Sequence, residues 1–194
     1  MSAPSKAPVK GDVVDPADIE DVRAGRLGDG EAYARLVRRH QQAVAARFRS
    51  FTRDANVVEE LTHEVFVEAY FALGGFRGDA PFAHWLNRIA TRVGYRFWKR
   101  RRREPACEPI EGHAAAAGEP AAEPEHSADR LHALLAKLAP RDRIVLTLLY
   151  LEDRPIGEAA ELIGWSQTMV KVQAFRARRR LRTLLEAEDR EEHA

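Results

Sequence analysis

The sequence of 194 residues contains a single cysteine, Cys107, and no long uninterrupted apolar stretch. One cysteine excludes a disulfide within the chain and a zinc site built from a cysteine cluster. No apolar run approaches the roughly 20 residues that a membrane-spanning helix needs. The first residues (MSAPSKAPVKGD) also lack the apolar segment of a signal peptide. These absences predict a cytoplasmic protein that does not insert into a membrane.

The sequence also lacks a recognisable set of catalytic or metal-binding residues. His63 and Glu64 begin like a zinc-protease motif, but position 67 is valine instead of the second histidine that the motif requires. The other histidines are scattered, and Cys107 has no basic or histidine neighbour to lower the pKa of its thiol. We therefore expect no enzymatic activity, no catalytic residue, no bound metal and no cofactor.

Charged residues, in contrast, are abundant and unevenly distributed. They make up 31% of the sequence, although the net charge is only +1. Positive charge is concentrated at 92–103 and 171–182, whereas 104–129 contains acidic residues and no lysine or arginine. Because local charge decides where nucleic acid binds, the two basic segments are the candidate nucleic-acid contacts.

Helical periodicity runs through most of the sequence, and no strand-like alternation is long enough to predict a sheet. Residues 16–103 contain a short helix and three longer amphipathic helices, which predicts a four-helix bundle. A second helical domain is expected at 129–187. The intervening segment 104–128 has four prolines, many acids and no apolar period, which predicts a flexible acidic linker. We expect disorder at 1–15 and a fraying acidic tail at 188–194. The expected fold class is all-α.

The stretch 156–185 has the pattern of a helix-turn-helix. Its first apolar stripe ends at Gly164, a residue suited to the positive φ found just past a helix end. Ser166 is placed to cap a second helix, on which residues from Val170 to Leu181 share one apolar face. The opposite face is basic, as in a helix that enters the DNA major groove. An ordinary amphipathic helix with a solvated basic face is the simpler alternative.

The helix expected at 82–103 interleaves basic and aromatic side chains, and a glycine-rich loop precedes it. Cations bind phosphates and aromatic rings stack on unpaired bases, so loop and helix together could hold a base turned out of a duplex. The same pattern fits an amphipathic helix with core aromatics, and Trp85 and Phe97 are expected in the core. The loop residues Phe76 and Arg77 are expected to be exposed.

In combination, these features resemble bacterial RNA polymerase sigma factors of the extracytoplasmic-function (ECF) group of the sigma-70 family. Residues 60–73 (ELTHEVFVEAYFAL) resemble the helix of region two that binds the polymerase clamp. Residues 76–103 resemble the part that melts and reads the −10 element, and 135–182 resemble region four, which reads the −35 element. The resemblance implies an initiation factor that binds core RNA polymerase and promoter DNA, and whose family is often silenced by an anti-sigma factor. Under this resemblance, residues 16–103 correspond to region two and residues 129–187 to region four.

The resemblance also assigns candidate contacts. Those for core polymerase are Glu60, Leu61, His63, Glu64 and Glu68. Those for the −10 element and melting are Phe76, Arg77, Asp79, His84, Trp85, Asn87, Arg88, Arg92 and Tyr95. Those for the −35 element are Ser166, Gln167, Thr168, Lys171, Gln173, Arg176 and Arg179. Periodicity places Glu60, Glu64 and Glu68 on one exposed acidic ridge. Lys171 and Gln173 are expected near base edges, because the start of a recognition helix usually enters the groove. Arg176 and Arg179 are expected at phosphates.

Several positions depart from the family pattern, and two other functions stay open. His63 stands where the family usually has glutamine, and Thr168-Met169 stands where it favours glycine and threonine, so the promoter sequence cannot be transferred from a relative. A stand-alone helix-turn-helix regulator would explain 156–185 but leave the aromatic and basic helix at 82–103 unused. A protein-interaction adaptor would leave the basic recognition face unexplained.

Overall fold

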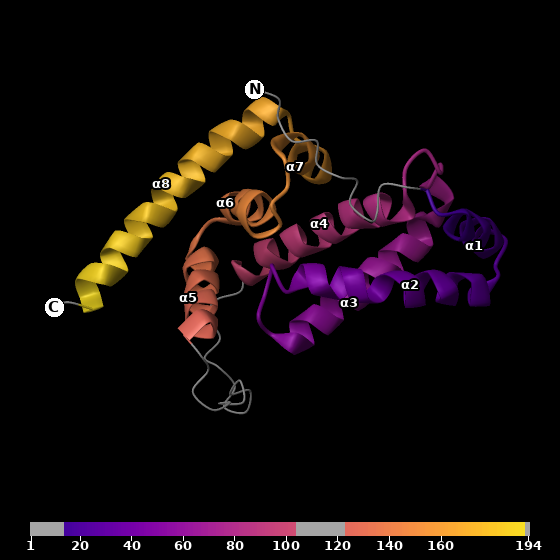
Figure 1. Cartoon of the computed structure of the whole chain (residues 1–194), viewed down its shortest axis with the longest axis horizontal. Coiled ribbons are helices and arrows are strands. Elements are labelled where there is room, and N and C mark those ends of the chain that lie inside the picture. The colour runs from indigo at the N-terminus through magenta and orange to yellow at the C-terminus, as the bar shows by residue number, and fades with distance from the viewer. Residues whose placement is uncertain (1–13, 104–122, 193–194) are drawn as a thin grey trace, which may run out of the picture.

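The computed structural model describes residues 14–103 and 123–192, and all regular elements in these ranges are helical. The first domain contains α1 (Pro16–Arg26), α2 (Gly30–Phe48), α3 (Ala55–Ala72), the 3₁₀ turn η1 (Leu73–Gly75) and α4 (Phe82–Arg101). The second contains α5 (Glu123–Lys137), α6 (Pro140–Leu146), the π-helical turn η2 (Thr147–Leu151), α7 (Ile156–Ile163) and α8 (Gln167–Glu192). The all-α prediction with two helical domains is confirmed (Figure 1). Most of the predicted linker (104–122) and of the predicted N-terminal disorder (1–13) lies outside the described residues.

Aspartate caps set the starts of the first three helices. The side chains of Asp15, Asp29 and Asp54 each accept hydrogen bonds from backbone N–H groups in the first turns of α1, α2 and α3. Asp15 is thus the cap of α1, whereas Asp18, in the first turn, is buried and accepts a hydrogen bond from Arg39. These caps leave few unpaired N–H groups, so each helix has a defined first residue.

Two predicted boundaries are wrong, and both errors involve the same pair of helices. Helix α5 begins at Glu123, so the end of the segment predicted as a linker is helical. Helix α8 continues to Glu192, through most of the tail that was expected to fray. The two helices hold each other, because Lys137 of α5 forms an ion pair with Glu188 of α8, with Nζ and Oε1 2.6 Å apart.

The two domains pack directly against each other. Figure 1 shows α6 and α7 beside α4, with α8 along the outer edge. A single apolar core continues from Phe51 and Trp98 of the first domain to Ile144 and Leu148 of the second. The arrangement of the domains is therefore fixed by side-chain packing between them as well as by the chain that connects them.

A buried ion pair crosses this interface. Arg47 of α2 pairs with Glu152, with Nε and Oε1 3.0 Å apart and both side chains less than a tenth exposed. The guanidinium also donates to the carbonyl of Asn87 and to the hydroxyl of Thr91, both on α4. Burial lowers the pKa of Arg47, against the opposing effect of Glu152. The hydrogen bonds around this arginine compensate for removing its charge from water.

Arg143 of α6 makes a second interdomain contact. Its guanidinium lies 4.3 Å from the ring centroid of Trp98, and Nη2 donates to the carbonyl of Phe51 at 2.9 Å. Trp98 in turn stacks on Phe51, with centroids 4.6 Å apart. Burial, followed by the nearby charge of Arg101, lowers the pKa of Arg143 to about 10. The interface thus holds a cation on aromatic surfaces as well as paired cations, since Arg53 of the first domain also pairs with Asp129 of α5.

Close approach of Phe51 to α4 requires a glycine at position 94. A Cβ atom at Gly94 would overlap the Phe51 ring. We predict that Gly94→Ala lowers the free energy of unfolding by about 1–3 kcal/mol, as expected for overpacking a dense core. Urea denaturation of the full chain measures this change. The control is Gly74→Ala, where an added Cβ would meet nothing within 4 Å. Equal stability of the two variants would contradict the packing described here.

Candidate nucleic-acid and polymerase interfaces

The helix-turn-helix forms as the sequence predicts. Gly164 ends α7 with φ of 78°, and its N–H donates to the carbonyl of Ala160. The hydroxyl of Ser166 accepts a hydrogen bond from the N–H of Met169 at 3.2 Å, so it caps α8. Val170 and Ala174 are buried against the rest of the domain. The opposite face of α8 is therefore held toward solvent.

Most of the residues predicted for the −35 element lie on this exposed face. They are Ser166, Gln167, Thr168, Lys171, Arg176 and Arg179. The face also carries apolar side chains that the sequence analysis missed, Val172 and Phe175, which are 45% and 63% exposed. Their spacing along the helix was the available signal, but only polar and basic residues of this helix were predicted as contacts.

Gln173 is the exception among the −35 candidates. Its side-chain amide donates to Asp142 of α6, a carboxylate that is fully buried. Arg180 pairs with the other oxygen of the same carboxylate. Gln173 therefore joins α8 to α6, and the structure does not support the base-edge role predicted for it.

The −10 candidates gather around a hollow of about 450 Å³ formed by the loop after η1 and the first half of α4. The predicted residues that line it are Phe76, Arg77, Asp79, His84, Trp85, Arg88 and Arg92. The expected exposure of Phe76 is wrong, since its side chain is 4% exposed and packs edge-on against Phe82. Arg26 donates to the carbonyls of Leu73 and Phe76 and so ties the loop to the bundle.

Asn87 and Tyr95 do not line the hollow. Asn87 lies at the interdomain interface, where its carbonyl accepts a hydrogen bond from Arg47. Tyr95 is half-buried and lies farther along α4, facing the second domain. In this arrangement the second domain restricts access to two of the predicted −10 contacts.

The acidic ridge predicted on α3 is largely neutralised. Arg96 of α4 forms ion pairs with both Glu64 and Glu68. In the pair with Glu64, Nη2 and Oε1 are 3.0 Å apart. Leu61 is fully buried, so it cannot contact a partner in this conformation. The prediction of an exposed row of three carboxylates is therefore wrong, because a neighbouring helix supplies the counter-charge.

A different line of residues on α3 is exposed. Glu60, His63, Val67 and Phe71 follow one another at spacings of three and four, so they share one helix face. Val67 is 40% exposed and Phe71 is 82% exposed. We call these four residues the α3 stripe. Exposed apolar side chains beside charged ones are typical of protein-protein contact sites. The sequence analysis predicted Glu60 and His63 as partner contacts, but not Val67 and Phe71.

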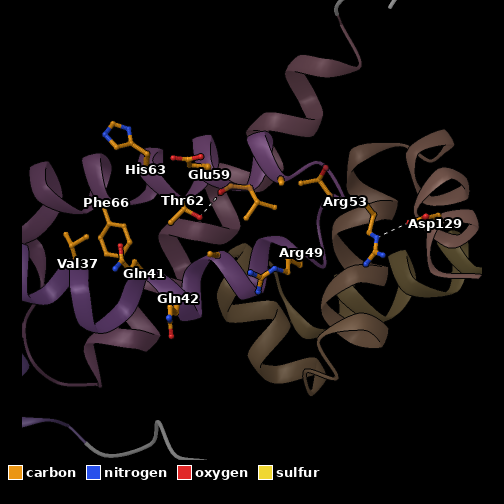
Figure 2. Close-up of a pocket in the computed structure, with 14 residues that line it drawn as sticks. Val37, Gln41, Gln42, Arg49, Arg53, Glu59, Thr62, His63, Phe66 and Asp129 are labelled. Atoms are coloured by element: carbon orange, nitrogen blue, oxygen red, sulfur yellow. Dashed lines mark hydrogen bonds and ion pairs between the residues drawn. The ribbon is translucent and has the colours of Figure 1, made fainter. Parts of the chain in front are cut away.

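A largely apolar groove of about 780 Å³ adjoins the α3 stripe (Figure 2). Figure 2 shows Val37 and Phe66 toward one end of the groove and the ion pair of Arg53 with Asp129 at the other. His63 contributes to both the groove and the stripe. The exposed side of α3 and the gap between α2 and α3 therefore form one continuous surface.

The described residues offer no site for a metal and no membrane span. No group of three or more histidine, cysteine, aspartate or glutamate residues there could hold an ion. No helix in the described ranges has the length and apolar character needed to cross a bilayer.

Comparison with known proteins identifies the family of this chain. Residues 36–104 match the model of sigma-70 region 2, and residues 128–181 match that of sigma-70 region 4. The RNA polymerase sigma factor CnrH of Cupriavidus metallidurans is 33% identical over 188 residues, which cover 90% of this chain and 98% of that protein. The chain belongs to the extracytoplasmic-function group of the sigma-70 family. It is a transcription initiation factor, so a stand-alone regulator and an adaptor are both excluded as its primary role.

Other relatives agree with this membership. The ECF RNA polymerase sigma factor SigM of Mycobacterium tuberculosis is 26% identical over 169 residues, covering 87% of this chain and 85% of SigM. The solved structure of CnrH in complex with the cytosolic domain of CnrY superposes with a TM-score of 0.58 at 29% identity. It covers 88% of this chain and 98% of the CnrH chain.

The hydrogen bond from Gln173 to Asp142 yields a direct prediction. Gln173→Ala should lower the free energy of unfolding by about 1–3 kcal/mol, because a buried carboxylate oxygen loses a donor. The matched control is Gln167→Ala, at an exposed position on the same helix, with an expected change within about 0.5 kcal/mol. Thermal unfolding of the full chain measures both. If Gln173→Ala kept its stability and changed base preference in −35 duplex binding, the base-edge role would be restored.

Proposed function

We propose that this sigma factor uses three separate surfaces. The α3 stripe binds core polymerase, the loop hollow with the adjoining face of α4 holds the −10 element, and the first half of α8 reads the −35 element. The observation that carries the proposal is that the two DNA surfaces are basic and exposed on different domains, whereas the α3 stripe carries no arginine or lysine. Polymerase supplies the chemistry in the cytoplasm, and this protein, which is not itself an enzyme, selects the promoter.

The loop hollow suits an unpaired base and its phosphates. Trp85 is half-buried and offers part of its ring to the hollow, while Arg77, Arg88 and Arg92 are exposed around it. An aromatic ring contributes stacking that accepts any base, and arginines neutralise the backbone phosphates on either side. Phe76 supports this surface from beneath by packing against Trp85.

The exposed face of α8 suits the major groove. Lys171 and Thr168 lie near its N-terminal end, which is the end that usually reaches base edges. Val172 and Phe175 add an apolar surface that fits the methyl group of thymine. Arg179 lies farther along the helix and is suited to phosphate contacts, which fix register without reading sequence.

The α3 stripe suits a protein partner because its centre is apolar and its end is acidic. Phe71 is the most exposed aromatic side chain in the described residues. Large aromatic side chains dominate the binding energy of interfaces once a partner removes them from water. Glu60 lies at the other end of the stripe, where a carboxylate orients a basic partner more than it adds affinity.

We predict that Phe71→Ser reduces holoenzyme formation at least about tenfold, the effect of losing one buried contact of roughly 1.4 kcal/mol. The measurement is competition for purified core polymerase. Leu27→Ser is the matched control, since Leu27 is 90% exposed and lies away from the stripe in the loop after α1. Both variants should unfold like the parent. Equal affinity of Phe71→Ser and the parent would remove the stripe from the polymerase interface.

The closed arrangement of the two domains is not compatible with reading a whole promoter. Elements centred at −10 and −35 lie about 25 base pairs apart, or on the order of 80 Å at 3.4 Å per step. Here the second half of α4 and the residues 173–180 of α8 line one cleft. We infer that the domains separate when the protein joins polymerase on DNA, which also exposes Asn87.

We predict that Glu152→Gln shifts the free protein toward an open form. The substitution leaves the buried Arg47 without its counter-charge, at a cost of about 3–5 kcal/mol that separation of the domains relieves. Small-angle X-ray scattering should show a larger radius of gyration. The control is Glu158→Gln, which removes an ion pair with Arg154 inside the second domain. An unchanged radius for Glu152→Gln would show that the ion pair does not hold the domains together.

A protein inhibitor is the second partner that we propose. The relative CnrH was solved in complex with the cytosolic domain of CnrY, and another relative, RpoE of Bartonella quintana, with the anti-sigma factor NepR. An inhibitor that covers the α3 stripe and enters the adjoining groove would compete with polymerase. Native mass spectrometry with a candidate inhibitor and limiting polymerase distinguishes competition from simultaneous binding.

A further inference from the structure

A cleft of about 570 Å³ lies between the two domains, and it includes one residue predicted for each promoter element, Tyr95 and Arg176. We call it the interdomain cleft. The first domain contributes Tyr95 and Lys99 of α4, and Arg102 and Arg103 just after it. The second contributes Ala139, Pro140, Arg141, Asp142, Gln173, Arg176 and Arg180. The cleft exists only while the domains are packed, because each supplies one wall.

The walls of the interdomain cleft are strongly positive. Six of its side chains are lysine or arginine, and its only carboxylate is Asp142. Asp142 is fully buried and already bonded to Arg180 and Gln173, so it does not neutralise the other cations. In the described ranges, no carboxylate forms an ion pair with Lys99, Arg102 or Arg176.

Bringing these cations together costs free energy. Like charges on the two walls repel each other, and because all six side chains are exposed, water and salt screen part of this repulsion. A polyvalent anion in the cleft would convert this repulsion into attraction and would be bound by both domains at once.

Promoter DNA accounts for single residues of this site in the open form, but it does not explain a site that uses both walls at once. In the closed form the two walls face one shared space, whereas the −10 and −35 elements need the walls far apart. The volume of the cleft instead lies in the range of small-ligand pockets, roughly 300–1,000 Å³. Arginines arranged around such a space match phosphate oxygens, with which they form charge-assisted hydrogen bonds. The half-buried ring of Tyr95 adds a surface on which a base could stack.

We propose that the closed protein binds a short chain of phosphates in the interdomain cleft, as found in nucleoside polyphosphates and in inorganic polyphosphate. Because the ligand contacts both walls, it binds the closed form and not the open one, and it therefore stabilises the closed form by mass action. The proposal uses the closed arrangement of the domains and does not depend on which surface binds polymerase.

Isothermal titration of the full chain with sodium tripolyphosphate, at constant ionic strength, tests the site. We expect one site per chain and a raised melting temperature. Arg102→Gln and Arg176→Gln remove one cation from each wall, and each should weaken binding about tenfold. The matched controls are Arg100→Gln and Arg178→Gln, which remove a cation from the same helices outside the cleft. Controls that weaken binding as much as the cleft variants would overturn the proposal, because only total charge would then matter.

Two further arms decide whether closure matters and which ligand is preferred. Glu152→Gln, which opens the interdomain contact, should weaken tripolyphosphate binding while leaving −35 duplex binding intact. If scattering shows that this variant is open and it still binds tripolyphosphate as tightly as the parent, the site does not lie between the domains and the proposal is overturned. Tighter binding of a nucleoside triphosphate than of tripolyphosphate would support the site and identify a nucleotide as its ligand. Equal affinity would support a site for the phosphate chain alone.

Discussion

The relative position of the two domains depends on a buried ion pair between Arg47 and Glu152, residues 105 positions apart in the chain. Burial of two charges is costly, and only good geometry compensates for it. Here three residues accept hydrogen bonds from Arg47, because Asn87 and Thr91 of α4 join Glu152. The ion pair therefore adds little net stability, but it favours one orientation of the domains. Removing either partner leaves a buried charge without its counter-ion, which separation of the domains would solvate.

This constraint links the three functional surfaces of the protein. The α3 stripe lies on the first domain, as does all of the adjoining groove except Asp129, and both are open to a protein partner while the domains are closed. The loop hollow is also accessible, but Asn87 and Tyr95 face the second domain. If the proposed assignment of these surfaces holds, a closed sigma factor meets polymerase before it reads a promoter. The same closure assembles cations from both domains around the interdomain cleft.

The sequence predicted the features that depend on neighbouring residues. Helical periods, the cap by Ser166 and the positive φ of Gly164 all follow from local chemistry, and all are present. The errors involve partners distant in sequence. Glu64 meets Arg96, and Gln173 meets Asp142, at separations of 32 and 31 residues. Periodicity shows which face of a helix is polar, but not which polar side chains another helix will neutralise. The family resemblance located the functional segments, yet the exposed Phe71 emerged only once the packing of α3 and α4 was known.

The account requires that the domains be closed in the free protein and separated in the initiation complex. Energy transfer between dyes at Ala43→Cys on α2 and Thr183→Cys on α8, with Cys107 replaced by serine, measures this directly. Both labelled positions are exposed. The account predicts high transfer efficiency for the free protein and low efficiency when core polymerase and promoter DNA are added. Equal efficiency in the two states would contradict it.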